Sequence, residues 1–91
     1  MKYIICYDIK DDKLRNKVMK YLEKIATRLQ FSVFTCELVP EKSAAIWKKL
    51  LKMTSEEEDC LLLMAPLCKT CEKGMRIKGN PLESEKKFLV V

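Results

Sequence analysis

The sequence contains no histidine and only two glycines, and each absence excludes a class of function. Without histidine, the 91-residue chain has no Ser-His-Asp triad, no histidine general base and no histidine-containing zinc site. The two glycines, Gly74 and Gly79, cannot build the glycine-rich loops that hold nucleotide phosphates. Chemistry in this chain therefore has to come from carboxylates, basic side chains or cysteines.

Long hydrophobic runs are also missing. The longest one after the N-terminal segment spans residues 60–68, against about 20 residues needed to cross a bilayer. The first apolar run stops at Asp8 and is too short for a signal peptide. Five cysteines, an odd number without a secretory signal, indicate reduced thiols. The sequence therefore predicts a cytoplasmic protein.

What is present is typical of a small folded domain. The residues are 48% apolar and 34% charged, which argues against disorder. Alternating or apolar segments predict strands at 2–9, 60–66, 76–78 and 87–91, with a turn at 80–81. Apolar residues at helical spacing predict two helices. The first begins at residues 11–12, and the second covers 41–53 with Ile46, Trp47, Leu50 and Leu51 facing inward.

Residues 28–39 are rich in strand-forming residues and fit either one long strand or a hairpin bent near Phe31 and Ser32. The resulting order predicts one α+β domain over 1–91, a ferredoxin-like βαββαβ sandwich with an extra C-terminal strand. Its core covers about 1–79 and its last strand about 87–91, which could pair with a sheet edge of its own chain or a partner's. So small a core favours a homodimer.

The charge is uneven along the chain. Residues 1–54 carry 12 basic and 6 acidic side chains, whereas residues 55–91 carry 6 and 7. Lys13, Lys17, Lys20 and Lys24 form a stripe on the first helix, which is either a solvated face or a surface for phosphates. Arg15 and Arg28 are the stronger candidates, because a guanidinium grips phosphate bidentately. The surplus favours a polyanion without choosing between RNA and DNA.

Asp8 is the candidate for chemistry, because it is the only carboxylate in an otherwise apolar strand. It is either a helix cap or solvated loop residue, or a metal ligand. One carboxylate per chain is few, but a two-fold axis near the strand end would bring two together. Phe31 and Phe34 could stack on bases, with core packing favoured for at least one of them. Cys68 and Cys71 form a single CxxC, which is half a zinc site and lies outside the usual redox context, so a structural turn is the simplest interpretation.

Several ordered motifs together resemble the small CRISPR-associated core protein that works with the integrase in spacer acquisition, the Cas-two family. They are Tyr7-Asp8-Ile9 at the end of the first strand, Asp-Asp-Lys-Leu-Arg-Asn-Lys-Val at 11–18, Arg-Leu-Gln-Phe-Ser-Val-Phe at 28–34, Cys-Glu-Leu at 36–38 and Pro-Leu-Cys-Lys-Thr-Cys at 66–71. The resemblance covers essentially the whole chain.

The resemblance implies a ferredoxin-like homodimer whose last strand packs across the subunit boundary. Asp8 would be the catalytic residue and the ligand of Mg²⁺ or Mn²⁺ near the dimer axis, in a metal-dependent endonuclease acting on RNA or DNA. Arg15 and Arg28 would be phosphate contacts or site arginines, joined by Lys13 and Lys17 in nucleic-acid binding.

Tyr7 and Phe34 would support this site, and the partner would be the CRISPR-associated integrase. Three other functions stay open: a non-catalytic nucleic-acid-binding scaffold bridging the integrase, a toxin-type ribonuclease of similar fold, and a small regulatory or metal-binding domain.

Overall fold

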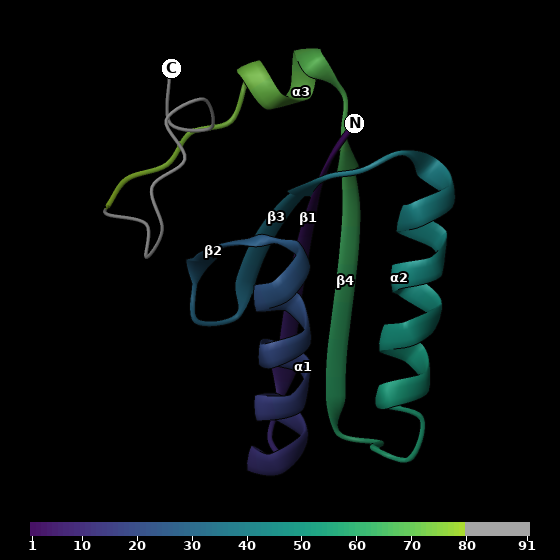
Figure 1. Cartoon of the computed structure of the whole chain (residues 1–91). Helices are drawn as coiled ribbons and strands as arrows, with labels where there is room; N and C mark the ends of the chain where they lie inside the picture. The colour runs from purple at the N-terminus through teal and green to yellow at the C-terminus, as the bar shows by residue number, and fades with distance from the viewer. Residues whose placement is uncertain (80–91) are drawn as a thin grey trace.

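The computed structural model of the protein describes residues 1–79. Its elements are β1 (Lys2–Ile9), α1 (Asp12–Ile25), β2 (Thr27–Gln30), β3 (Val33–Glu37), α2 (Pro40–Met53), β4 (Cys60–Leu67) and α3 (Lys69–Lys73) (Figure 1). The first six elements confirm the predicted βαββαβ order. The turn predicted at 80–81 and the strand predicted at 87–91 lie outside the described residues.

β1 and α1 follow from the local sequence. Side chains alternate along β1, so that Tyr3, Ile5, Tyr7 and Ile9 are buried. α1 begins after Asp11, whose carboxylate accepts a hydrogen bond from the Leu14 N–H at 2.8 Å. The helix cap is therefore Asp11 and not Asp8. On α1, the apolar face buries Val18 and Leu22, whereas the four lysines of the predicted stripe are exposed.

Residues 28–39 form the hairpin and not the single long strand. β2 and β3 pair antiparallel, and the chain turns between them at Phe31 and Ser32. A backbone hydrogen bond from the Tyr7 N–H to the Ser32 carbonyl, 3.2 Å long, ties this turn to β1. The sequence left the two forms open because no Asn-Gly or Asp-Gly pair marks the turn.

α2 begins with Pro40 in its first turn, a position where the missing proline N–H costs no helical hydrogen bond. Ile46 and Leu50 are buried as predicted, and Trp47 packs against the core. The prediction for Leu51 is wrong, because its side chain is 47% exposed. Successive helix residues are rotated by about 100°, so Leu51 turns away from the sheet when Leu50 faces it.

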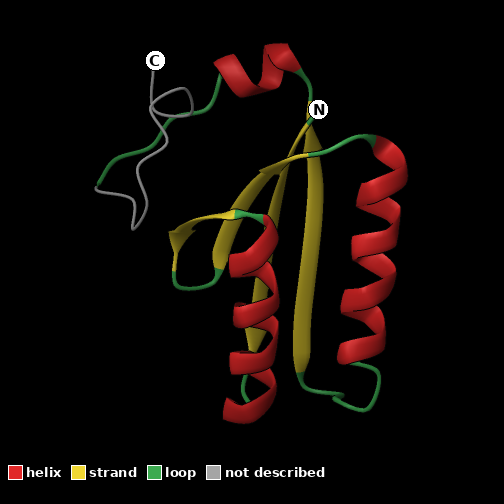
Figure 2. Cartoon of the chain, viewed as in Figure 1, coloured by secondary structure: helices red, strands yellow, loops and turns green. Residues whose placement is uncertain are grey.

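The four strands form one antiparallel sheet in the order β2-β3-β1-β4 (Figure 2). This order and the element sequence confirm the ferredoxin-like fold. Both long helices pack on one face, where the core gathers around Ile5, Phe34, Leu22 and Leu50. Among residues 1–79, no helix covers the other face, which we call the open face; Leu61 and Leu63 are exposed on it, whereas Lys2 and Thr35 are buried. None of the described helices is long and apolar enough to span a membrane.

Beyond β4, the chain makes the single helical turn α3 and ends it at Gly74. The strand predicted at 76–78 is wrong, because these residues have no regular structure. The segment after α3 runs away from the sheet, so none of the described strands pairs with it (Figure 1). A short strand that carries Arg76 and Lys78 has too few apolar residues to form without such a neighbour.

Candidate functional site

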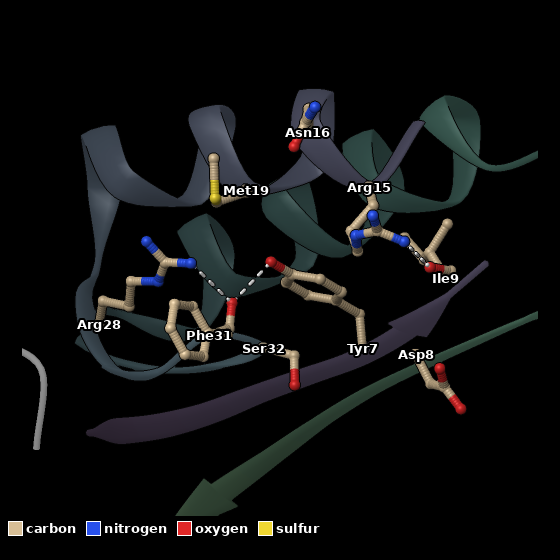
Figure 3. A pocket seen from close by; sticks show the side chains of 9 residues that line it. All are labelled: Tyr7, Asp8, Ile9, Arg15, Asn16, Met19, Arg28, Phe31 and Ser32. Atoms are coloured by element: carbon tan, nitrogen blue, oxygen red, sulfur yellow. Dashed lines mark hydrogen bonds between the residues drawn. The ribbon is translucent and has the colours of Figure 1, made fainter. Parts of the chain in front are cut away.

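Tyr7 and Asp8 are neighbours in the sequence, but their side chains leave β1 in opposite directions. Tyr7 is 4% exposed and points toward α1, whereas Asp8 is exposed on the open face. Figure 3 shows the Asp8 carboxylate pointing away from Tyr7 and the two arginines. This is the ordinary consequence of strand alternation. The predicted site is therefore divided between the two faces of the sheet.

The helix-covered side gathers Tyr7, Phe34 and Arg28. The rings of Tyr7 and Phe34 stack with their centroids 6.2 Å apart. The Tyr7 hydroxyl donates a hydrogen bond to the Phe31 carbonyl at 2.9 Å. Burial raises the pKa of the Tyr7 phenol, and the charges of Arg28 and Arg15 lower it in part. The phenol is therefore a neutral hydrogen-bond donor that holds the β2–β3 turn.

Arg28 is used within the chain. Its side chain is 16% exposed and forms an ion pair with Glu23 at 3.4 Å. Its Nη2 atom donates to the Phe31 carbonyl at 3.2 Å, so this oxygen accepts bonds from both Tyr7 and Arg28 (Figure 3). The guanidinium carbon lies 5.2 Å from the Phe31 ring centroid and 5.9 Å from that of Phe34. These contacts hold the two Nη atoms of Arg28 within the chain, whereas its buried Nε has no hydrogen-bond partner among the described residues.

Arg15 lies more openly at the turn between β1 and α1. Its Nη1 atom donates to the Ile9 carbonyl at 3.1 Å, and its Nη2 atom pairs with the Asp12 carboxylate. The side chain is still 42% exposed. Lys13 and Lys17 are exposed one helical turn apart on the same helix. These three cations remain accessible to an anionic partner.

A cavity of about 440 Å³ lies between the two arginines. It is bounded by the end of β1, one side of α1 and the β2–β3 turn. Its lining residues are Tyr7, Asp8, Ile9, Arg15, Asn16, Met19, Arg28, Phe31 and Ser32 (Figure 3). Phe31 stands at the cavity with its side chain 70% exposed, whereas Phe34 is fully buried. One of the two phenylalanines is therefore core, as predicted, and the other is free to contact a ligand.

Asp8 on the open face has no polar partner among the described side chains. Within residues 1–79, its carboxylate makes no hydrogen bond and no ion pair. It lies opposite Leu61 of β4, which is 56% exposed, and Leu63 nearby is 45% exposed. In the described part of the chain, no three Cys, Asp or Glu side chains lie close enough together to hold a metal ion. A single chain therefore offers one carboxylate at the end of an apolar surface.

Comparison with known proteins identifies the family. The family of CRISPR associated protein Cas2 matches residues 1–75. The chain belongs to the Cas2 family. The CRISPR-associated endoribonuclease Cas2 2 of Synechocystis sp. is 38% identical to this Cas2 chain and aligns with 87% of it and 85% of the relative. The CRISPR-associated endoribonuclease Cas2 1 of Chloroflexus aurantiacus is 32% identical over the whole of both chains.

Solved structures share the fold of the chain. A chain of a partial Cas6-RT-Cas1–Cas2 complex is 31% identical to this Cas2 chain, with a TM-score of 0.73 over 92% of each. Cas2 of Streptococcus pyogenes, 23% identical, shares the fold with a TM-score of 0.72 over 87% of this chain and 100% of its own.

Sequence reasoning missed two partners that shape the covered side of this Cas2 chain. Glu23 pairs with Arg28, and the Phe31 carbonyl accepts bonds from both Tyr7 and Arg28. Glu23 resembled any other exposed acidic residue of α1, and a backbone carbonyl has no signature in a sequence. Asn16 and Met19 of the cavity were missed as well, although Met19 lies four residues after Arg15 and therefore on the same side of α1.

Proposed function

We propose that this Cas2 chain acts in CRISPR spacer acquisition as a homodimer, bound to a Cas1-type integrase. We further propose that it is a metal-dependent endonuclease of RNA, with DNA as the second substrate class. Relatives that align with most of the chain are named endoribonucleases, and a structural neighbour belongs to a complex with Cas1. The observation that carries the proposal is the unpartnered Asp8 carboxylate at the end of the apolar open face.

The composition of the open face supports the homodimer. An antiparallel sheet that keeps one face in water normally carries polar residues there. Here Leu61 and Leu63 of β4 point outward from the helices, beside Cys6 and Asp8 of β1. A second copy would bury both leucines of each subunit, and each leucine, already about half buried, would contribute about half of the roughly 1.5–3 kcal/mol that a fully exposed side chain contributes. Because a two-fold interface places the same patch on both subunits, an axis beside Leu61 would bring the two Asp8 side chains together.

The proposed metal is Mg²⁺ or Mn²⁺, held by Asp8 of both subunits. Mg²⁺ binds one or two protein carboxylates and keeps several waters, so two Asp8 side chains fit its requirements. One chain alone does not supply such a pair. When bound, the ion would supply Lewis acidity toward the scissile phosphoryl group. Without a cation, the two carboxylates would repel each other and oppose dimer formation.

The other site residues have separate proposed roles. Arg15, Lys13 and Lys17 would contact phosphates, because their cations are accessible at the end of the molecule where β1 ends and α1 begins. Arg28 would act as a site arginine that fixes the turn bearing Phe31. Tyr7 and Phe34 would support this turn from beneath, through the hydroxyl bond and the ring contact described above.

The deciding experiment compares the wild type with Asp8→Asn, and with Glu56→Gln as a control that removes one exposed carboxylate of the 54–59 loop. Labelled single-stranded RNA and double-stranded DNA are incubated with each protein and Mg²⁺ or Mn²⁺. We expect cleavage by the wild type and by Glu56→Gln, and a loss of at least about 100-fold in Asp8→Asn. Substrate binding should change little, because the phosphate contacts lie on α1.

A second measurement keeps the metal proposal separate from catalysis. The dimer dissociation constant is measured with and without Mg²⁺ by sedimentation. In the wild type, Mg²⁺ should tighten the dimer by relieving repulsion between the two Asp8 carboxylates. In Asp8→Asn, the dimer should form equally well with or without the ion. Cleavage that persists in Asp8→Asn, or Mg²⁺ tightening both proteins alike, would place the site elsewhere.

A non-catalytic scaffold is the second candidate, favoured by the likeness to a chain from a Cas1–Cas2 complex. In this function, the dimer would bridge integrase subunits and hold DNA through the same cations, with Asp8 unused. Dimeric wild type that binds nucleic acid and cleaves neither substrate would support it. Reconstitution with an integrase would then be expected to depend on Lys13 and Lys17 and to tolerate Asp8→Asn.

A further inference from the structure

The five cysteines differ sharply in accessibility. Cys36 is buried, Cys6 and Cys60 are half-buried, and Cys68 and Cys71 are exposed. The exposed pair follows the end of β4 where Leu67 lies opposite Lys2, whereas Asp8 lies at the other end of the sheet opposite Leu61. The proposed nuclease and scaffold functions make no use of this pair.

Cys68 and Cys71 are held close to each other by the local backbone. Cys68 precedes α3 in an extended conformation, and Cys71 lies within the helical turn that follows. The Cys68 Sγ accepts a hydrogen bond from the Cys71 N–H at 3.4 Å. The Cys68 sulfur therefore lies beside the backbone of the residue with which it would form a disulfide, and the two thiol side chains are in contact.

The two thiols also differ in acidity. Hydrogen bonds from the Cys71 backbone and side chain lower the pKa of Cys68, and the same contact raises the pKa of Cys71. Burial raises the pKa of Cys36 to about 11 and also raises that of Cys6. A thiolate is the attacking species in disulfide exchange, so Cys68 is the favoured nucleophile.

A hollow of about 310 Å³ opens beside Cys68. Its walls come from the start of β1, the end of β3 and the start of α3, and they carry charges of both signs. The Met1 amine pairs there with Glu37 at 3.6 Å, and Lys69 and Glu72 stand on the α3 side. A small zwitterionic disulfide therefore finds both open access to Cys68 and charges of either sign.

We propose that Cys68 and Cys71 form a redox-active dithiol that exchanges with small peptide disulfides such as oxidised glutathione. The Cys68 thiolate attacks one sulfur, the glutathione S–S bond breaks, and the released glutathione thiolate takes a proton from water. Cys71 then loses its proton to water and attacks Cys68 Sγ, which releases the second glutathione. The protein dithiol is oxidised by two electrons to a disulfide, and one glutathione disulfide is reduced to two thiols.

The test treats the folded full-length protein with oxidised glutathione, blocks the remaining thiols with an alkylating reagent, and measures the intact mass and the linked peptides. The wild type should lose two hydrogen atoms and give one Cys68–Cys71 peptide, which dithiothreitol reverses. Cys71→Ser should stop at a glutathione adduct on Cys68. Cys68→Ser should form its adduct on Cys71 several-fold more slowly at neutral pH.

Cys6→Ala serves as the matched control, because Cys6 is half-buried in β1, and this variant should behave as the wild type. The proposal fails if the wild type keeps both thiols under a large excess of oxidised glutathione. It also fails if the disulfide forms between chains, or if the two single variants form adducts at the same rate. Stoichiometric zinc in the purified protein, released when either cysteine is replaced, would overturn it in favour of a metal site.

Discussion

The two faces of the sheet are built from the same strands and present opposite chemistry. The covered face places Tyr7, Phe34 and Arg28 in a packed cluster in which the described polar contacts lie within the chain. The open face presents Asp8 without a partner among the described residues, beside the exposed Leu61. The polar groups of this covered cluster are paired within the chain except for the buried Arg28 Nε, whereas the open face exposes its carboxylate and leucine to solvent.

This difference separates structural from reactive roles inside one short motif. Because strand side chains alternate, the Tyr7 and Asp8 side chains point to opposite faces of the sheet, although both residues line the cavity shown in Figure 3. Tyr7 fixes the hairpin turn from the covered side, whereas Asp8 belongs to no cluster of metal-binding side chains within the described residues. Substitutions on the covered face should therefore act on folding, and those on the open face on assembly and cleavage.

The largest expected effect is on the free energy of unfolding, when the two phenylalanines of the hairpin are replaced in turn. Phe34 is fully buried, and Phe31 is 70% exposed. Phe34→Ala should lower the free energy of unfolding by about 3–5 kcal/mol, because it leaves a cavity against Tyr7 and Ile5. Phe31→Ala should lower it by about 1 kcal/mol or less. Urea denaturation measures both, and equal losses would show that the hairpin is not divided into core and surface as described.

Much of the fold could be predicted from the sequence, because it depends on local patterns. Alternation fixes β1, helical spacing fixes the buried side of α1, and Pro40 fixes the start of α2. The hairpin could not be decided, because the bond from the Tyr7 N–H to the Ser32 carbonyl joins residues far apart in the chain. The prediction wrongly included Leu51 in the inward face of α2, because a leucine is apolar whether it points toward the core or toward solvent.

The candidate site was predictable only in part. Resemblance named Tyr7, Asp8, Arg15, Arg28 and Phe34, but not which of them lie together. Two consequences needed the structure, namely the loss of Arg28 to contacts with Glu23 and Phe31 and the isolation of Asp8 on the other face. Both depend on side-chain direction and packing, which a list of motif residues does not contain.

A smaller effect is expected on dimer formation, when an exposed leucine of the open face is compared with one on the outer side of α2. Leu63 on the open face is 45% exposed, and Leu51 on the outer side of α2 is 47% exposed. Leu63→Glu should weaken the proposed dimer by about 100-fold, or about 2.7 kcal/mol, because it places an unpaired charge in the proposed interface. Leu51→Glu adds the same charge at similar exposure and should leave the dimer unchanged.

Light scattering over a dilution series measures both dissociation constants, and circular dichroism checks that both variants remain folded. If both substitutions weaken the dimer equally, the interface is not confined to the open face. If neither does, the two subunits meet through another surface, and the pairing of Asp8 side chains is lost with it.

The smallest expected effect is on the stability of the protein at alkaline pH, in a comparison of one cysteine from each face of the sheet. Burial, with a further contribution from the Glu37 charge, raises the pKa of Cys36 on the covered face from 9.0 to about 11. As the pH rises, the unfolded chain ionises first, so the stability due to the protonated thiol is present below pH 9 and is lost between about pH 9 and 11. One proton changes the unfolding free energy by at most about 1.4 kcal/mol per pH unit.

Cys36→Val should flatten this decline by up to that amount, measured by urea denaturation from pH 8 to 10.5 at a dilution where the protein is monomeric. Cys6→Val on the open face should flatten it less, and equal slopes for the two variants would mean that the open face excludes water as well as the covered one does.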